Sequence, residues 1–268
     1  MTVFARLLAD RRRGALGWTI GMVAGVASIV GLWPTVRGND DMERVVNDLP
    51  TSVRALIGSQ EGIPLTSAPG YLQARLFSTI LPILLLVYAI GLGSRAIGGA
   101  EEDGTLQLVV TAPVTRRHIA SQRFAASTVL LLGLAAVGLL TSLVLGALVG
   151  IFDDVTVGRT LVAALAVLEL AILHLAIAFT FGAITGRRGP AVTAASAVAV
   201  GGYVLHGLAA SAEAIRPVRV VSPWWWLLDR NLLVQDASFL SVGLPLLLAA
   251  ATFVVGVLRF EQRDLRFP

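Results

Sequence analysis

The sequence predicts an all-α integral membrane protein that crosses a bilayer about six times. Hydrophobic residues make up 56% of the 268 residues and charged residues only 14%, whereas a soluble domain usually carries about 25% charged residues. The apolar residues also fall in long blocks that approach or exceed about 20 residues, the length at which a helix crosses a hydrocarbon core of about 30 Å. Helices are the expected form because an unpaired backbone polar group is costly in lipid.

The first expected element is an amphipathic helix over residues 1–14, in which apolar residues recur at helical spacing among arginines. Such a segment is typical of a helix that lies in the membrane interface. The apolar run after it is longer than the core of a cleaved signal peptide, so we expect it to be the first span. The expected spans are about 15–34, 71–94, 124–151, 159–185, 191–212 and 239–258, all in one transmembrane domain over 1–268.

The polar segments between the spans differ in length and pattern. Residues 35–70 carry several acids and the pattern of one or two short amphipathic helices, and residues 95–123 and 213–238 form the other long connections. With both termini on one side, that side holds 13 arginines and six acids, and the other holds eight arginines and ten acids. Because cytoplasmic segments are rich in cationic residues, we expect both termini and residues 95–123 in the cytoplasm, and the chain in the plasma membrane of a bacterium.

Composition argues against a catalytic or cofactor-binding role for this chain. It has no cysteine, and all 21 of its cationic residues are arginine. Disulfides and thiolate chemistry are therefore excluded, as is the lysine-containing phosphate loop of ATPases. Three histidines on separate segments offer no converging set of metal ligands. Ser196 and His206 lie about 15 Å apart along one expected helix, which is too far for a nucleophile and its base.

The segment after the second span has the most informative pattern. Three acids at 101–103 precede Gly104 and Thr105, and Leu106, Val109 and Val110 then form an apolar stripe. We expect a short helix outside the bilayer, with the acids at its N-terminus, where the helix dipole favours negative charge, and with a threonine cap. The stripe must be covered, either by the membrane surface or by a cytoplasmic partner that receives the helix in a groove.

Residues 101–116 read EEDGTLQLVVTAPVTR. This stretch, placed directly after a second span, resembles the coupling-helix region of the ABC-2 family of ABC exporter permeases. The chain length, the six expected spans, the amphipathic start, the larger outer loop between spans five and six and the tail over 260–265 are also similar to that family. Arg123 stands where the family often has lysine, so the charge is kept.

The resemblance implies a permease subunit that binds no cofactor itself. ATP and Mg would be held by a separate ATPase subunit, and two copies of each subunit, with a homodimer or related heterodimer of permeases, would form the working exporter. The residues that match the loop and coupling helix seated on the ATPase are Glu101, Glu102, Gly104, Thr105, Leu106, Leu108, Pro113, Thr115 and Arg116.

Glu169 lies inside the fourth expected span, where an ionisable side chain is costly unless it is paired or neutral. Counting from the turn at 186–190 places Glu169 level with His206, and His174 level with Tyr203. We expect a Glu169–His206 contact and a weaker His174–Tyr203 contact, although each side chain could face another helix or a water-filled cavity. Glu169 would either line a translocation path or dimer interface, or link helices by hydrogen bonds.

Three consecutive tryptophans, Trp224, Trp225 and Trp226, follow Pro223 in the last long connection. Tryptophan collects at membrane interfaces, so we expect these rings to anchor the outer surface. In ABC-2 permeases the corresponding region often forms short re-entrant helices at the outer mouth. The rings could therefore also close the exit.

Three functions remain open from the sequence. The leading hypothesis is an ATP-driven exporter of a hydrophobic or amphipathic substrate, a drug-like molecule or a lipid, because the span interiors offer mainly aliphatic side chains. A proton-coupled secondary transporter that uses Glu169 and the histidines is the second, but the inverted repeats that it predicts are not evident. An ABC-2 complex with a role other than export is the third. No nucleic-acid partner is expected, because the arginines lie scattered between apolar blocks.

Overall fold

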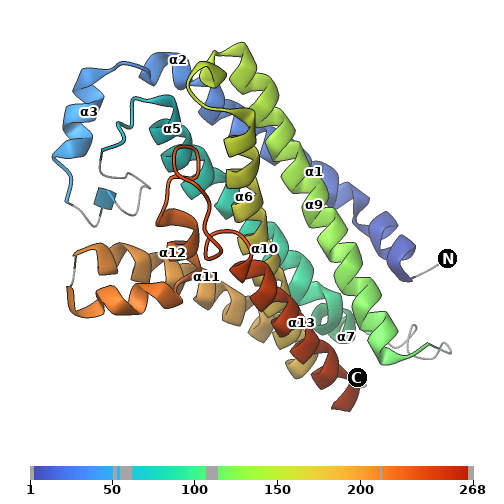
Figure 1. Cartoon of the computed structure of the whole chain (residues 1–268). Coiled ribbons are helices and arrows are strands. Elements are labelled where there is room, and N and C mark those ends of the chain that lie inside the picture. The colour runs from blue at the N-terminus through green and yellow to red at the C-terminus, as the bar shows by residue number, and fades with distance from the viewer. Residues whose placement is uncertain (1–2, 51–52, 55–61, 107–113, 212, 265–268) are drawn as a thin grey trace.

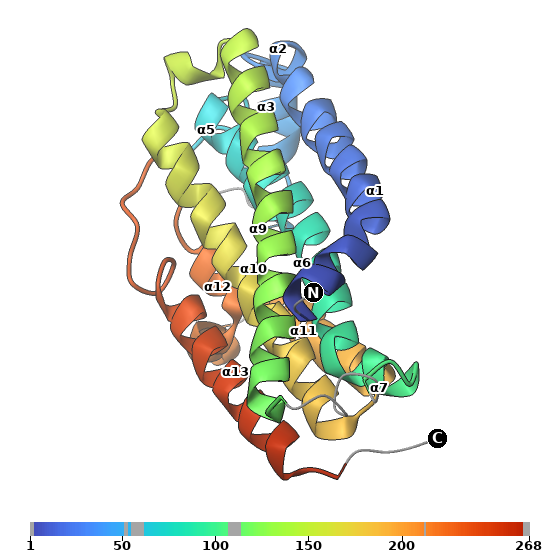
Figure 2. The same cartoon turned by 90° about the vertical axis from the view of Figure 1, so that its right-hand side faces the viewer.

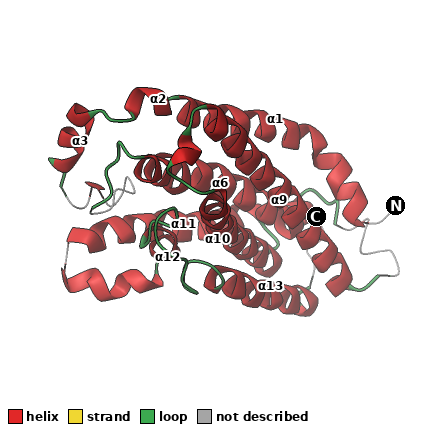
Figure 3. Ribbon diagram, turned by 45° about the horizontal axis from the view of Figure 1, so that its top comes forward, coloured by secondary structure: helices red, strands yellow, loops and turns green. Residues whose placement is uncertain are grey.

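The computed structural model describes residues 3–50, 53–54, 62–106, 114–211 and 213–264. Within these ranges all regular structure is helical (Figure 3). Six helical segments of the described chain are long and apolar enough to cross a membrane: Arg11–Val36, Ala68–Glu102, Arg116–Leu148, Val157–Thr185, Arg188–Ala209 and Leu244–Gln262. The predicted fold class, an all-α multi-pass membrane protein with about six spans, is confirmed at this level.

The first two spans come from the N-terminal part of the chain. Its elements are α1 (Val3–Gly31), α2 (Trp33–Val36), α3 (Asp40–Asn47), α5 (Ala68–Tyr71), the π-helical η1 (Leu72–Ile80), α6 (Leu81–Ser94), the π-helical η2 (Arg95–Gly99) and α7 (Ala100–Glu102). Residues 1–14 were predicted to form a separate interfacial helix. In the structure the described part of this segment is continuous with the first span, and Figure 2 shows the first turns of α1 at an angle to the rest. Its position in the interface stays a prediction.

The remaining four spans come after residue 115. Their elements are α9 (Arg116–Leu148), the 3-10 helix η3 (Ile151–Asp153), α10 (Val157–Thr185), α11 (Arg188–Ser211), the 3-10 helix η4 (Glu213–Val221), α12 (Pro223–Leu228) and α13 (Leu244–Gln262). Threonine caps begin two of the spans: the Thr115 hydroxyl accepts the His118 N–H, and the Thr156 hydroxyl accepts the Arg159 N–H, each at 3.3 Å. These bonds satisfy N–H groups that have no partner inside the helix.

Two predicted boundaries differ from the structure on the same side of the bundle. The second span was expected to end at residue 94 and the third to begin at 124. The helices instead run to Glu102 and from Arg116, because a helix satisfies its own backbone groups beyond the apolar core, where polar side chains can reach water. The connection between these spans is correspondingly shorter than the 95–123 segment expected from polarity. In the connection 35–70, α3 confirms one of the expected short helices.

The fourth span, α10, lies at the centre of the bundle. It packs against α6, α9, α11 and α13, which surround it in Figures 1 and 3. Glycines let the backbones approach: a Cβ atom at Gly93 would lie 2.4 Å from the Leu175 carbonyl oxygen, and one at Gly256 would lie 2.5 Å from the Thr180 hydroxyl. Close contact between small residues is the main source of helix association in lipid, where apolar burial alone gives little advantage.

Both ends of the described chain contact the first turns of α9. The Phe4 N–H donates to the Gln122 side-chain carbonyl at 3.2 Å, and the Arg116 guanidinium donates to the Arg263 carbonyl oxygen at 2.6 Å. The N-terminal and C-terminal segments therefore meet at the same end of the third span.

The contact between α6 and α10 gives a first prediction. Replacing Gly93→Ala forces the new Cβ against the Leu175 carbonyl, so we expect the protein to lose about 1–3 kcal/mol of stability, the usual cost of overpacking. Thermal unfolding of the purified chain in detergent measures this. Gly91→Ala is the matched control in the same helix, because nothing lies within 4 Å of its Cβ position; an equal loss in both variants would contradict close packing at Gly93.

Candidate functional site

The segment that matches the coupling-helix pattern begins at the end of the second span. Helix α7 ends at Glu102, and Gly104 then adopts a left-handed conformation with φ +67°. The Leu106 N–H and the Thr105 hydroxyl both donate to the Ala100 carbonyl, at 2.9 and 3.1 Å. The helix that these acids were predicted to precede and Thr105 to cap falls in residues 107–113, outside the described residues, so it stays a prediction. The acids end a helix, and Thr105 bonds back to it.

Glu101 is buried and paired with an arginine from the other end of the sequence. Its side chain is 4% exposed, and that of Arg263 is 18% exposed. The two form a bidentate contact in which Nη1 donates to Oε1 at 3.0 Å and Nη2 donates to Oε2. A carboxylate at a helix C-terminus is disfavoured by the helix dipole, and Arg263 supplies the charge that compensates it.

The same tail joins two further helices. Arg263 Nε donates to the Ala183 carbonyl at 3.0 Å, near the end of α10. At the start of α9, Arg116 donates to the Arg263 carbonyl at 2.6 Å and Arg117 pairs with the Glu261 carboxylate. Residues 261–263 therefore tie together α7, α9 and α10. We call this set of contacts the tail network. In the sequence, the tail was noted only for its similarity to tails of the ABC-2 family. The opposite charges of Glu261 and Arg263 were the one sign that it could form ion pairs with other segments.

Burial divides the residues assigned to partner contact into two groups. Leu106 is 1% exposed and packs in a cluster with Ile97, Ile119, Phe179 and Phe260, so this part of the predicted apolar stripe is covered by the chain itself. Gly104 and Arg116 are half-buried, and Glu102, Thr105 and Thr115 are exposed, as are their neighbours Asp103 and Arg117. Leu108 and Pro113, together with Val109 and Val110, lie outside the described residues.

Glu169 lies within α10 and is buried, as predicted, but its partner is not His206. Its Oε2 atom accepts the Gly243 N–H at 2.7 Å. Gly243 precedes α13 with φ +118°, a conformation that glycine adopts at little cost. The bond satisfies an N–H group at the start of a helix and places a carboxylate where the dipole favours it. Of the two roles that the sequence left open for Glu169, this geometry fits the link between helices.

His174, by contrast, has its hydrogen-bond partner within its own helix. Nδ1 lies 2.8 Å from the Leu170 carbonyl oxygen, and Nε2 has no hydrogen-bond partner among the described residues. The ring therefore makes no hydrogen bond to Tyr203, the predicted partner. Tyr203 instead packs edge-on against Trp224, with the ring centroids 4.9 Å apart.

The three tryptophans lie in α12, where Pro223 occupies the first turn. Trp224 and Trp226 are buried, and their ring N–H groups donate at 2.7 Å to the carbonyl oxygens of Ala199 and Val220. Trp225 is half-buried, with the Arg219 guanidinium 5.4 Å from its ring centroid. Two rings thus fix α12 against α11 and η4, and Trp225 is the one with exposed surface.

The described chain is thus a multi-pass helical membrane protein with a polar network at one end and a buried carboxylate inside. In the comparison with known proteins, no family model, no curated protein and no solved structure matches the chain.

The tail network gives a second prediction. Glu101→Ala or Arg263→Ala leaves a partly or fully buried charge without its partner, so each should lower stability by about 3–5 kcal/mol. The double variant should lose less than the sum, because it leaves no lone charge. Thermal unfolding of the unchanged chain, the two single variants and the double variant provides the double-mutant cycle. Glu102→Ala, with an exposed neighbouring carboxylate, is the control; strict additivity would argue against a direct pair.

Proposed function

We propose that this chain is the permease subunit of an ATP-driven ABC-2 exporter, working with a separate ATPase subunit and a second permease copy in a bacterial plasma membrane. The observation that carries the proposal is the position and geometry of residues 100–106. They come directly after the second span, match the coupling-region pattern, and present Glu102, Asp103 and Thr105 outward while Glu101 and Leu106 are anchored inward.

The tail network supports a mechanical role for this segment. A force applied to the exposed turn at Glu102 would reach α13 through Arg263, α10 through the Ala183 carbonyl, and α9 through Arg116. Charge-assisted bonds of this kind are short and directional, so the turn would move with the helices rather than independently of them. Domain closure in the ATPase would then shift the bundle between inward-open and outward-open states.

An apolar cavity supports a hydrophobic or amphipathic substrate. A volume of about 290 Å³ lies between η1, α6 and the α11–α12 region, lined among others by Ile83, Val87, Val200, Tyr203 and Trp224. Its walls offer aliphatic and aromatic surface, the composition typical of small-molecule sites. Glu169 is bound to the start of α13, so we assign it a structural role rather than proton coupling.

Cross-linking tests the ATPase contact, because a chain without cysteine can carry a single reactive thiol. We expect a gene for an ABC ATPase to lie beside this one, Glu102→Cys to form a cross-link with that ATPase when the two are co-expressed, and ATP to change its yield. Asp154→Cys, exposed at the opposite end of the spans, is the control and should give none. Failure of the unmodified chain to copurify with that ATPase would refute the proposal.

The same two variants test the proposed orientation. If residues 95–123 face the cytoplasm, a maleimide that does not cross membranes should label Asp154→Cys in intact cells and Glu102→Cys only after the membrane is opened. The reverse pattern would place both termini outside and remove residues 100–106 from any cytoplasmic ATPase.

A further inference from the structure

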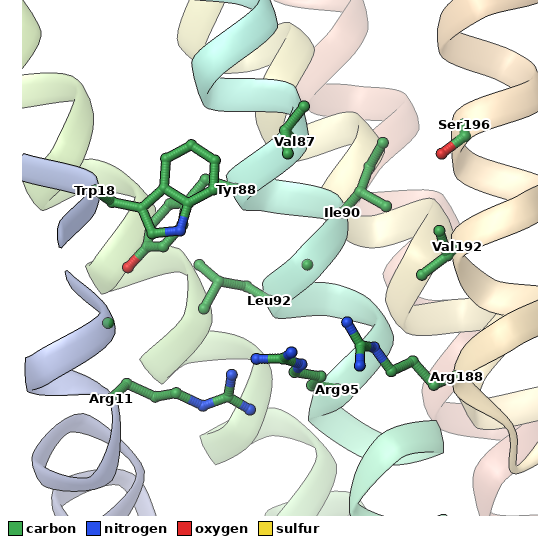
Figure 4. A pocket seen from close by; sticks show the side chains of 12 residues that line it. Arg11, Trp18, Val87, Tyr88, Ile90, Leu92, Arg95, Arg188, Val192 and Ser196 are labelled. Atoms are coloured by element: carbon green, nitrogen blue, oxygen red, sulfur yellow. The ribbon is translucent and has the colours of Figure 1, made fainter. Parts of the chain in front are cut away.

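A second and larger cavity lies between the first, second and fifth spans. Its volume is about 650 Å³, and α1, α6, η2 and α11 form its walls. Figure 4 shows the guanidinium groups of Arg11, Arg95 and Arg188 along one side of this space, each from a different helix. We call these three residues the arginine triad.

Arg95 and Arg188 have no acidic partner among the described residues that line the cavity. None of the described residues that line it is an aspartate or a glutamate, and neither Arg95 nor Arg188 forms an ion pair with any described residue. Arg11 also lies close enough to the buried Arg123 for their charges to interact. Clustered like charges repel more strongly near a low-dielectric region than in water, so this end of the cavity favours an anion.

The donor geometry narrows the type of anion. Each guanidinium presents a planar fork of N–H groups that matches phosphate oxygens in bidentate fashion. Arg188 is also the first residue of α11, a helix of 24 residues, and the N-terminus of a helix favours phosphate through its N–H groups and its dipole. Three guanidinium groups from three helices thus face one space, which suits a group with several negatively charged oxygens.

The opposite side of the cavity is apolar and aromatic. Trp18 packs against Tyr88 with ring centroids 5.2 Å apart, and Val87, Ile90 and Val192 continue the wall (Figure 4). Val87 is 54% exposed, so this wall opens sideways on the membrane-spanning surface. Val87, Ile90 and Ser196 also line the smaller apolar cavity, so apolar surface extends along α6 and α11 away from the triad.

We propose that this cavity binds an anionic membrane lipid, with its phosphate group on the arginine triad and its acyl chains along Val87, Ile90 and Val192. The combination of a polyvalent cationic end and a laterally open apolar wall fits an amphiphile that enters from the adjacent leaflet. The inference concerns the binding properties of this chain alone. It holds whether or not an ATPase docks at Glu102.

Native mass spectrometry of the full chain in detergent, titrated with phosphatidylglycerol and separately with zwitterionic phosphatidylcholine, tests the proposal. We expect phosphatidylglycerol to bind more tightly, and Arg188→Gln or Arg95→Gln to weaken it about tenfold, the effect of losing one charge-assisted contact. Arg187→Gln is the matched control: it removes the same charge one residue away, outside the cavity lining, and should leave affinity unchanged.

A second pair of variants tests the apolar wall without altering charge. A Cβ atom at Gly91, which lines the cavity, and one at Gly133, on α9, both have nothing within 4 Å. Gly91→Leu should therefore fill the cavity and reduce phosphatidylglycerol binding, whereas Gly133→Leu should not.

Three outcomes would overturn the proposal. Equal affinity for the two lipids would show that the triad does not select an anionic headgroup. Equal losses of phosphatidylglycerol affinity in Arg187→Gln and Arg188→Gln would show that only the general surface charge matters. Full displacement of the lipid by millimolar inorganic phosphate, with no effect of Gly91→Leu, would assign the site to a small anion.

Discussion

The close approach of α6 to the central helix α10 is the constraint on which the rest of the structure depends. Lipid tails are as apolar as leucine, so helices in a bilayer gain little from hiding apolar side chains and associate through tight contacts between small residues. Gly93 meets the Leu175 carbonyl, and Gly98 lies against Gly182 and the backbone of Arg187. These contacts fix the second span along α10 up to the turn at Arg187, which positions Ala100–Leu106 beside the end of α10.

The polar contacts at this end then result from the geometry that the glycines set. Because the second span ends beside Ala183, the Glu101 carboxylate comes within reach of Arg263, and α13 must run along α10 for its last turn to arrive there. The opposite end of the same α10–α13 pair is held by Glu169 and the Gly243 N–H. One carboxylate near each end of α13, Glu169 at its start and Glu101 at its end, thus holds this helix against the bundle, and the burial of Glu169 has a structural reason.

The sequence was sufficient for the number, type and approximate place of the spans, because hydropathy over about 20 residues reports directly on the bilayer. It was insufficient to predict which groups the polar side chains bind within the chain. Level positions in a hairpin suggested His206 for Glu169, but a carboxylate accepts equally well from a backbone N–H, and every helix start offers such groups. Likewise Glu101 and Glu102 are the same residue type at adjacent positions of the motif, yet Glu101 is buried against Arg263 and Glu102 is exposed. This difference arises only from the faces of the helix on which the two side chains lie.

The arginines show the same difference between composition and arrangement. Arg11, Arg95 and Arg188 belong to the excess of cationic residues that predicts a cytoplasmic side, and along the sequence each merely flanks a different span. An orientation signal needs charge only near the end of a span, with no requirement that the side chains converge. Their position around one cavity, with no carboxylate among its described lining residues, therefore exceeds what topology demands. The packing of α1 and α11 around α6 brings this positive charge together. A bound anion would balance the charge, which gives the arrangement a physical reason.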